Sequence, residues 1–177
     1  MKILVISDTH QNQEMILSIL SLCESTEFDE ILHLGDDYQD AQPLIDAGFN
    51  VTRVPGTWTK EYLNKYIDNR VFENREGWRL FLSHTPEADY KDLVDDPDPQ
   101  KVVEKGDCDL FLHGHTHKPE IIENGKVVIC NPGHLKSLTD RGYPATYAIL
   151  ILTKTELNIS IFRHDTHELY DSFQKMK

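Results

Sequence analysis

Cysteine is scarce in this chain of 177 residues, and long apolar segments are absent. The three cysteines, Cys23, Cys108 and Cys130, are odd in number and form no Cys-x-x-Cys pair, which does not indicate a disulfide framework. The apolar run that follows Met1 and Lys2 is too short for a signal-peptide core or a membrane span. We therefore expect reduced, buried thiols, no membrane association and a cytoplasmic location.

Positive charge is also scarce, with 18 lysines and arginines against 30 aspartates and glutamates, so the net charge is −12. Nucleic acid and anionic membranes repel such a chain, and we expect no non-specific binding to either. A hydrophobic fraction of 39% and a charged fraction of 27% are typical of a globular protein. The length predicts one domain over residues 1–177, and the sequence allows, but does not require, a homo-oligomer.

Hydrophobic periodicity predicts different structures in the two halves of the chain. In the first half, helices and strands alternate, which favours parallel strands joined by helical crossovers: helices over 12–24 and 39–46, and strands over 30–34 and 49–54. In the second half, turn residues between apolar runs predict three hairpins: 70–74 with 78–83, 121–123 with 127–130, and 145–152 with 157–163. A strand over 110–113 and helices over 100–105 and 168–177 complete an α/β domain.

Four apolar runs end in side chains that bind divalent metals. The segments are Ile3–His10, Ile31–Asp36, Leu80–His84 and Leu110–His117. Each run is typical of a buried strand, and each stops at a carboxylate or an imidazole. Because strands of one sheet can deliver their ends to a single edge, we expect these side chains to meet around one site.

The four motifs differ in specificity. Asp8 followed by His10 is weak evidence, because Asp8 or Asp36 also suits the cap of a helix. His84 alone is more typical of a structural histidine. The Gly-His-Thr-His segment over 114–117 is far more specific, since its glycine permits a tight turn and its alternating imidazoles face one side.

These motifs, followed by Asn-Pro-Gly at 131–133, occur in the order found in calcineurin-like metallophosphoesterases. The sequence resembles in particular the small single-domain phosphodiesterases of bacteria and archaea, over nearly the whole chain. The resemblance implies an α/β fold built as a two-sheet β-sandwich flanked by helices. It also implies hydrolysis of a small phosphate ester, in particular a phosphodiester.

The resemblance further implies a centre with two divalent metal ions. It assigns Asp8, His10 and His117 to one ion, Asp36 as a bridge between the ions, and His84 and His115 to the second ion. A hydroxide between the ions is the implied nucleophile, because both cations lower its pKa. Carboxylates and imidazoles suit several first-row ions, and we expect Mn²⁺, with Ni²⁺, Fe²⁺ or Zn²⁺ as alternatives.

The chain departs from the family pattern after its third strand. Thr57 stands where the family has an asparagine ligand, and a hydroxyl is the poorer ligand, so we expect the second metal site to be weak. Trp58 follows it; we favour packing under the loop over a wall for an aromatic leaving group. Two further residues, His134 and Arg141, are candidates for contact with the substrate phosphate, with a surface position as the alternative.

Two other histidines, His33 and His113, immediately precede ligand motifs but fall inside strand patterns, so we expect burial or support of the ligands. Thr57 also keeps a different class of function open. The alternatives to a dinuclear enzyme are a weakly catalytic or non-catalytic binding scaffold, as in the retromer subunit of this fold, and an enzyme with one tightly bound metal. The retained histidines favour catalysis, because a pure scaffold has little physical need for them.

Overall fold

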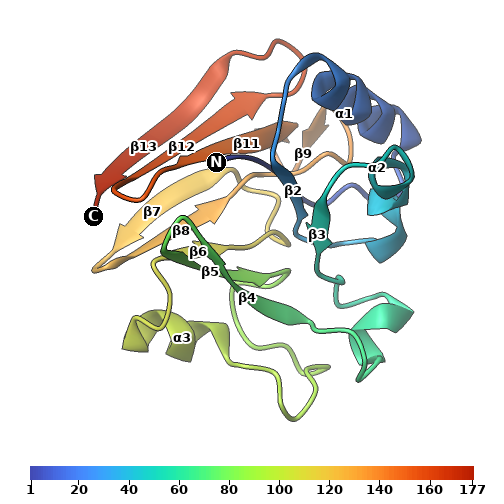
Figure 1. Ribbon diagram of the computed structural model, residues 1–177. Helices are drawn as coiled ribbons and strands as arrows, with labels where there is room; N and C mark the ends of the chain where they lie inside the picture. The colour runs from blue at the N-terminus through green and yellow to red at the C-terminus, as the bar shows by residue number, and fades with distance from the viewer.

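The computed structural model describes all 177 residues and contains two large sheets packed face to face, with helices outside them (Figure 1). In order across the sheet, the six-stranded sheet consists of β13 (Leu169–Met176), β12 (Glu156–Arg163), β11 (Thr146–Leu152), β1 (Lys2–Ile6), β2 (Glu30–His33) and β3 (Val51–Arg53). The five-stranded sheet consists of β4 (Arg70–Arg75), β5 (Trp78–Ser83), β6 (Leu110–Leu112), β8 (Val127–Asn131) and β7 (Glu120–Asn124).

Short helices and one small ribbon complete the fold. They are α1 (Gln13–Ser25), α2 (Gln42–Asp46), α3 (Pro99–Lys105), the 3₁₀ turns η1 (Tyr38–Ala41) and η2 (Lys60–Leu63), and the two-stranded ribbon of β9 (Thr139–Asp140) and β10 (Tyr143–Pro144). None of the helices combines the length and the apolar character that crossing a membrane requires. The predicted two-sheet sandwich flanked by helices is therefore confirmed.

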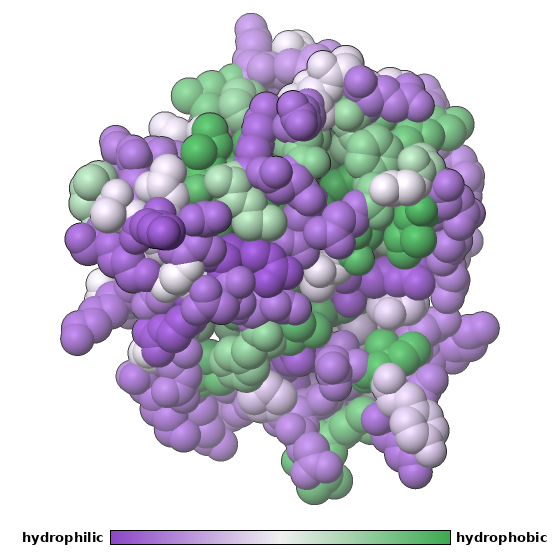
Figure 2. Space-filling model, in the orientation of Figure 1, coloured by the Kyte–Doolittle hydropathy of each residue, from purple (hydrophilic) through white to green (hydrophobic).

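Strand alternation divides the apolar side chains among three clusters. In β1, Ile3 and Val5 pack between the two sheets, whereas Leu4 and Ile6 face the cluster that includes the apolar residues of α1. On β5, Phe81 faces the opposite way, toward a smaller cluster with α3. Both sheets are thus buried on both faces in their central strands, which explains why these strands appear as continuous apolar runs. On the surface shown in Figure 2, hydrophilic residues predominate and apolar residues form small separate patches.

Register brings the ends of parallel strands to one level. In the six-stranded sheet, Ile6 pairs with His33 and His33 with Arg53, so β1, β2 and β3 stop together. In the other sheet, β5, β6 and β8 are parallel to one another and also end in register. The predicted parallel arrangement of the first half is confirmed, and the loops that carry the metal-binding motifs leave from these ends.

The prediction of a helix over 168–177 is wrong, because this segment forms β13. It pairs antiparallel with β12, with Ile159 opposite Phe173, and Phe173 packs partly buried against the central core. Lys175 Nζ also lies 3.0 Å from Glu123 Oε1 of β7 in the other sheet. A ten-residue helix with little to pack against is marginal, whereas the free edge of β12 supplies backbone partners.

Candidate metal centre

The loops at the strand ends bring all the predicted metal ligands into one region. The residues are Asp8 and His10 after β1, Asp36 after β2, His84 after β5, and His115 and His117 after β6. The first three come from the six-stranded sheet and the last three from the five-stranded sheet. The region therefore lies where the corresponding edges of the two sheets meet.

Asp8, His10 and His117 form the tightest group. His117 Nε2 lies 3.1 Å from His10 Nε2 and 3.3 Å from Asp8 Oδ1. One ligand atom from each of the three residues lies within 4.8 Å of the others. Asp8 and His117 are buried, while His10 is exposed, so the group is reached from solvent on the His10 side.

His84 and His115 form a second pair beside this group. His84 Nε2 lies 3.2 Å from His115 Nδ1. His84 Nδ1 lies 2.8 Å from the Leu34 carbonyl oxygen, which only accepts, so Nδ1 carries the proton and Nε2 of the neutral ring presents a lone pair. The backbone N–H of His115 donates to Asp8 Oδ2 at 2.9 Å, which joins the pair to the first group. Asp36 Oδ2 lies 3.0 Å from His10 Nδ1.

The backbone is strained where it carries these ligands. Asp8, His10, His115 and His117 have φ angles of +53°, +48°, +68° and +63°. Residues with a Cβ rarely occupy this left-handed region, and each instance costs on the order of 1–3 kcal/mol unless the surroundings enforce it. Strain concentrated on four predicted ligands indicates that the fold maintains their positions for a function rather than for stability.

Gly114 allows the loop of the second sheet to approach the first. A Cβ atom at Gly114 would lie 1.9 Å from Ser7 Oγ and 2.5 Å from Asp8 Oδ2. Ser7 Oγ itself donates to Asp8 Oδ2 at 2.7 Å, so any larger residue at position 114 would displace an oriented ligand. The glycine is required by this close approach, which refines the sequence-based prediction of a tight turn.

Comparison with protein families agrees with this architecture. The model of the calcineurin-like phosphoesterase superfamily domain matches residues 1–155. The chain belongs to this superfamily.

Similar proteins include phosphoesterases and a trafficking protein. Phosphodiesterase MJ0936 of Methanocaldococcus jannaschii is 21% identical over 146 residues, which cover 75% of this chain and 83% of that protein. The structure of the phosphoesterase YfcE from E. coli superposes with a TM-score of 0.73 at 21% identity over 98% of each chain. Vps29 of Entamoeba histolytica in complex with Zn²⁺ superposes with a TM-score of 0.69 at 19% identity over 99% of each chain.

The donor chemistry of this calcineurin-like domain fits a bound cation. Burial disfavours the charged form of Asp8, but the hydrogen bond from His117 and the charges of His84 and His117 outweigh it and lower the Asp8 pKa to about 2. Burial likewise opposes protonation of His117, yet its hydrogen bonds to Asp8 and Asp140 raise the His117 pKa. The carboxylates thus favour positive charge at His117 Nε2, the place where a metal ion would replace the proton.

Sequence analysis missed Asp140, which supports His117. Asp140 Oδ2 accepts a hydrogen bond from His117 Nδ1 at 2.6 Å, so the proton of a neutral His117 ring stays on Nδ1 and Nε2 is left for a metal. Asp140 lies in the small β9–β10 ribbon, 23 residues after its partner. The only local signal was a Thr-Asp-Arg-Gly turn, which does not point to a histidine.

The residues near the departure from the family pattern differ from one another in exposure. Thr57 is buried, and its carbonyl oxygen accepts a hydrogen bond from Lys91 Nζ at 3.0 Å. Trp58 does not pack under the loop as predicted, because 76% of its surface is exposed. The reason is Lys91, whose ammonium group covers the indole ring 3.1 Å from its centroid, in the place where core side chains would have to lie.

The two predicted phosphate contacts also differ. His134 is fully buried behind His117, with 5.4 Å between the ring centroids, and its Nε2 lies 3.2 Å from the Tyr143 carbonyl oxygen. Direct contact of His134 with a substrate is therefore corrected to a position behind a ligand. Arg141 is exposed and donates through Nη1 to the His115 carbonyl oxygen at 3.2 Å, so its contact with a phosphate stays a prediction.

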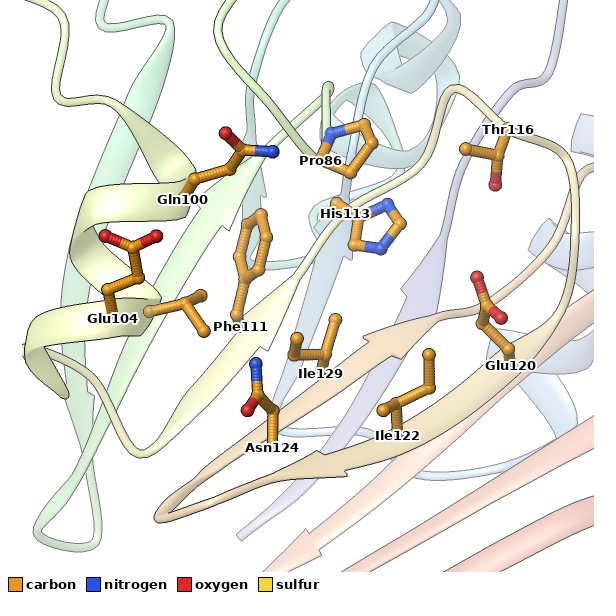
Figure 3. A pocket seen from close by; sticks show the side chains of 11 residues that line it. Pro86, Gln100, Glu104, Phe111, His113, Thr116, Glu120, Ile122, Asn124 and Ile129 are labelled. Atoms are coloured by element: carbon orange, nitrogen blue, oxygen red, sulfur yellow. The ribbon is translucent and has the colours of Figure 1, made fainter.

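His33 and His113 are both buried, in agreement with the prediction that they support the site. His33 Nε2 lies 3.2 Å from Thr9 Oγ1, in the loop between Asp8 and His10. The His113 ring lines a cavity of about 440 Å³ between α3 and the outer face of the five-stranded sheet (Figure 3). This cavity contains no predicted ligand, although Thr116 on its wall lies between His115 and His117.

Proposed function

We propose that this protein is a metal-dependent phosphodiesterase that acts on small phosphate esters. The observation that supports this most is the convergence of Asp8, His10 and His117 donor atoms within 4.8 Å on strained backbone. We assign these three residues to one divalent ion, His84 and His115 to a second ion, and Asp36 to both ions. Mn²⁺ is the proposed metal, with Ni²⁺, Fe²⁺ and Zn²⁺ as alternatives, since availability decides among ions with similar ligand preferences.

When bound, the ions supply activation of the attacking water and neutralisation of charge on the phosphoryl oxygens. The residues of the chain supply position. Asp8 is oriented by the hydroxyl of Ser7 and by the backbone N–H of His115, and His117 is oriented by Asp140. A carboxylate has two oxygens, so Asp36 can hold both ions and set their separation. These groups are ordered before the substrate arrives, which reduces the reorganisation needed in the reaction.

The charge of the chain agrees with a small substrate. With a net charge of −12, the protein repels extended polyanions, whereas two divalent ions would make one spot locally positive. A single phosphodiester group is then attracted to the metal site, while a long nucleic acid is repelled by the rest of the surface. Arg141, at the rim, is a candidate for a further contact with the phosphate.

A binding scaffold is the second candidate function. It is supported by the structural similarity to Vps29 of Entamoeba histolytica, with a TM-score of 0.72 over 100% of this chain, and by threonine in place of the asparagine ligand. The buried and strained ligands count against it, because a scaffold derives no benefit from their cost.

Elemental analysis paired with an assay separates these candidates. We expect protein purified without added metal to contain a first-row ion, and to hydrolyse bis(4-nitrophenyl) phosphate once Mn²⁺ is supplied. A chelator should abolish the activity and Mn²⁺ should restore it. His10→Ala should remove most of the activity, whereas His167→Ala, an exposed histidine outside the site, is the matched control. Tight metal binding without any hydrolysis in the presence of each of the four ions would support the scaffold instead.

A further inference from the structure

Trp58 is an exposed tryptophan at the edge of the metal centre. The chain has two tryptophans, and the other, Trp78, is only 2% exposed, compared with 76% for Trp58. Burial therefore does not explain why an indole stands at this position. A large apolar ring kept in water next to a candidate active site indicates a surface for recognition.

Neighbouring groups hold the indole in place. Lys91 Nζ lies 3.1 Å from the ring centroid and also donates to the Thr57 carbonyl oxygen at 3.0 Å. The loop that carries Lys91 is anchored in turn, because Asp92 pairs with the buried Arg70 at 2.8 Å. Trp58 is thus a positioned ring with a cation over one face, and a second ring can stack only on its opposite face.

Trp58 shares a cavity with two proposed ligands. The cavity has a volume of about 310 Å³ and is lined by His10, Gln11, Asp36, Asp37, Trp58 and Thr59. Since His10 and Asp36 belong to the metal centre, an ester substituent of a phosphate held there lies within reach of the indole. The cavity can therefore accommodate one of the two groups attached to the phosphorus.

The walls of this cavity define the chemistry of its occupant. Opposite Trp58, Gln11 Nε2 donates to Asp37 Oδ2 at 2.7 Å, which leaves Gln11 Oε1 as an acceptor. The lining contains no lysine or arginine, and the nearby ammonium of Lys91 is already engaged. A second phosphate would thus find carboxylates and no cation. An uncharged aromatic group with hydrogen-bond donors on its edge fits all of these features.

We propose that Trp58 is a stacking platform for a nucleobase, and that the preferred substrates are phosphodiesters that contain one nucleoside. This proposal rests on the proposed phosphodiesterase function. The base would stack on the open face of the indole and donate to Gln11 or Asp37, while the phosphate occupies the metal centre. Trp58 would then determine specificity without taking part in the chemical step.

Two esters that differ only in the base test the proposal. The substrates are the methyl ester of adenosine 5′-phosphate and the methyl ester of ribose 5-phosphate, and their hydrolysis by the full chain with Mn²⁺ is followed by phosphorus NMR. We expect the wild type to prefer the adenosine ester in kcat/KM, and W58L to reduce this preference about tenfold, the scale of base–aromatic stacking. W58F should retain most of it. Y66L is the matched control, because Tyr66 is also exposed beside a lysine but lies outside the cavity.

Tryptophan fluorescence provides a readout that does not depend on turnover. With Zn²⁺ present, AMP should quench the emission of the wild type and of Y66L, whereas ribose 5-phosphate should not. W58F retains only the buried Trp78, so AMP should leave its emission unchanged and the variant also corrects for absorption by adenine.

The outcomes separate this proposal from the proposed function. If both esters are hydrolysed equally well and W58L does not change their ratio, the stacking platform is wrong and the phosphodiesterase stands. If neither ester is hydrolysed but AMP still quenches Trp58 selectively, the nucleobase site stands and the phosphodiesterase is wrong. Equal quenching by AMP in the wild type and W58F would overturn the stacking platform.

Discussion

The Asp8–His10–His117 side and the His84–His115 side of the metal centre use similar residues but are supported differently. On the first side, carboxylates surround the imidazoles: Asp8 lies 3.3 Å from His117 Nε2, and Asp140 lies 2.6 Å from His117 Nδ1. On the second side, His84 is oriented by a backbone carbonyl, and a threonine stands where the family has an amide ligand. A carboxylate behind an imidazole makes it a stronger ligand than a neutral carbonyl does.

The pKa shifts of two histidines reflect this difference. The hydrogen bonds to Asp8 and Asp140 raise the His117 pKa despite burial, whereas burial, together with the charge of His84, lowers the His115 pKa. The field on the first side therefore favours a cation more strongly than the field on the second side. Similar motifs in a sequence can thus produce sites of unequal strength, because the supporting groups come from elsewhere in the chain.

The largest effect should come from the residue that belongs to both sides. We expect Asp36→Asn to reduce phosphodiester hydrolysis by at least about 100-fold, and His84→Ala to reduce it less, because His84 serves only the weaker ion. Initial rates at limiting Mn²⁺ provide the measurement, with circular dichroism to confirm folding. Near-wild-type rates in both variants would contradict a centre with two ions.

Removing the support of the first side should have the next largest effect. Asp140→Asn takes the negative charge from behind His117, and we expect the affinity of the tighter ion to fall about 10- to 100-fold. Calorimetric titration with Mn²⁺ measures this affinity. Asp165→Asn is the control, because Asp165 is an exposed aspartate that pairs with Arg163, away from the site. An unchanged affinity of the tighter ion in Asp140→Asn would mean that the hydrogen bond to His117 does not support metal binding.

Restoring the family ligand should make the two sides more equal. Thr57→Asn is expected to strengthen the second ion and to raise hydrolysis about tenfold at limiting Mn²⁺, with little gain when Mn²⁺ saturates both sites. Rates across a Mn²⁺ series provide the test, and Thr155→Asn, on an exposed turn, is the control. If the wild type already binds two ions with equal affinity, the asymmetry argued above is wrong.

The smallest effect is a difference in titration between His117 and His115 in the metal-free protein. NMR should show His117 losing its proton at a higher pH than His115. A raised pKa stabilises the fold below the unfolded value and loses this contribution as pH rises through the folded pKa, so His117 favours folding at low pH. His115 has the opposite sign, and its lowered pKa destabilises the fold as pH falls. The reverse order of titration would show that the carboxylates do not dominate the first side.

Much of the fold and most of the candidate site follow from local patterns. The apolar runs of β1, β2, β5 and β6 predict buried strands, and the donors that follow them lie together because parallel strands end in register. The small ribbon of β9 and β10 was not predicted, since strands of two residues have no periodicity. Asp140 was missed for the same reason.

The sequence by itself determined the two-sheet architecture, the family and the positions of six candidate ligands, because these depend on short segments and their order. Only the tertiary structure decided that residues 169–176 form an edge strand, that Asp140 supports His117 and that Trp58 stands in solvent beside the metal centre. Each of these depends on a partner far away in the chain: β12, the loop after β6, and Lys91. Local preferences do not encode such partners, since packing selects them after the chain has folded.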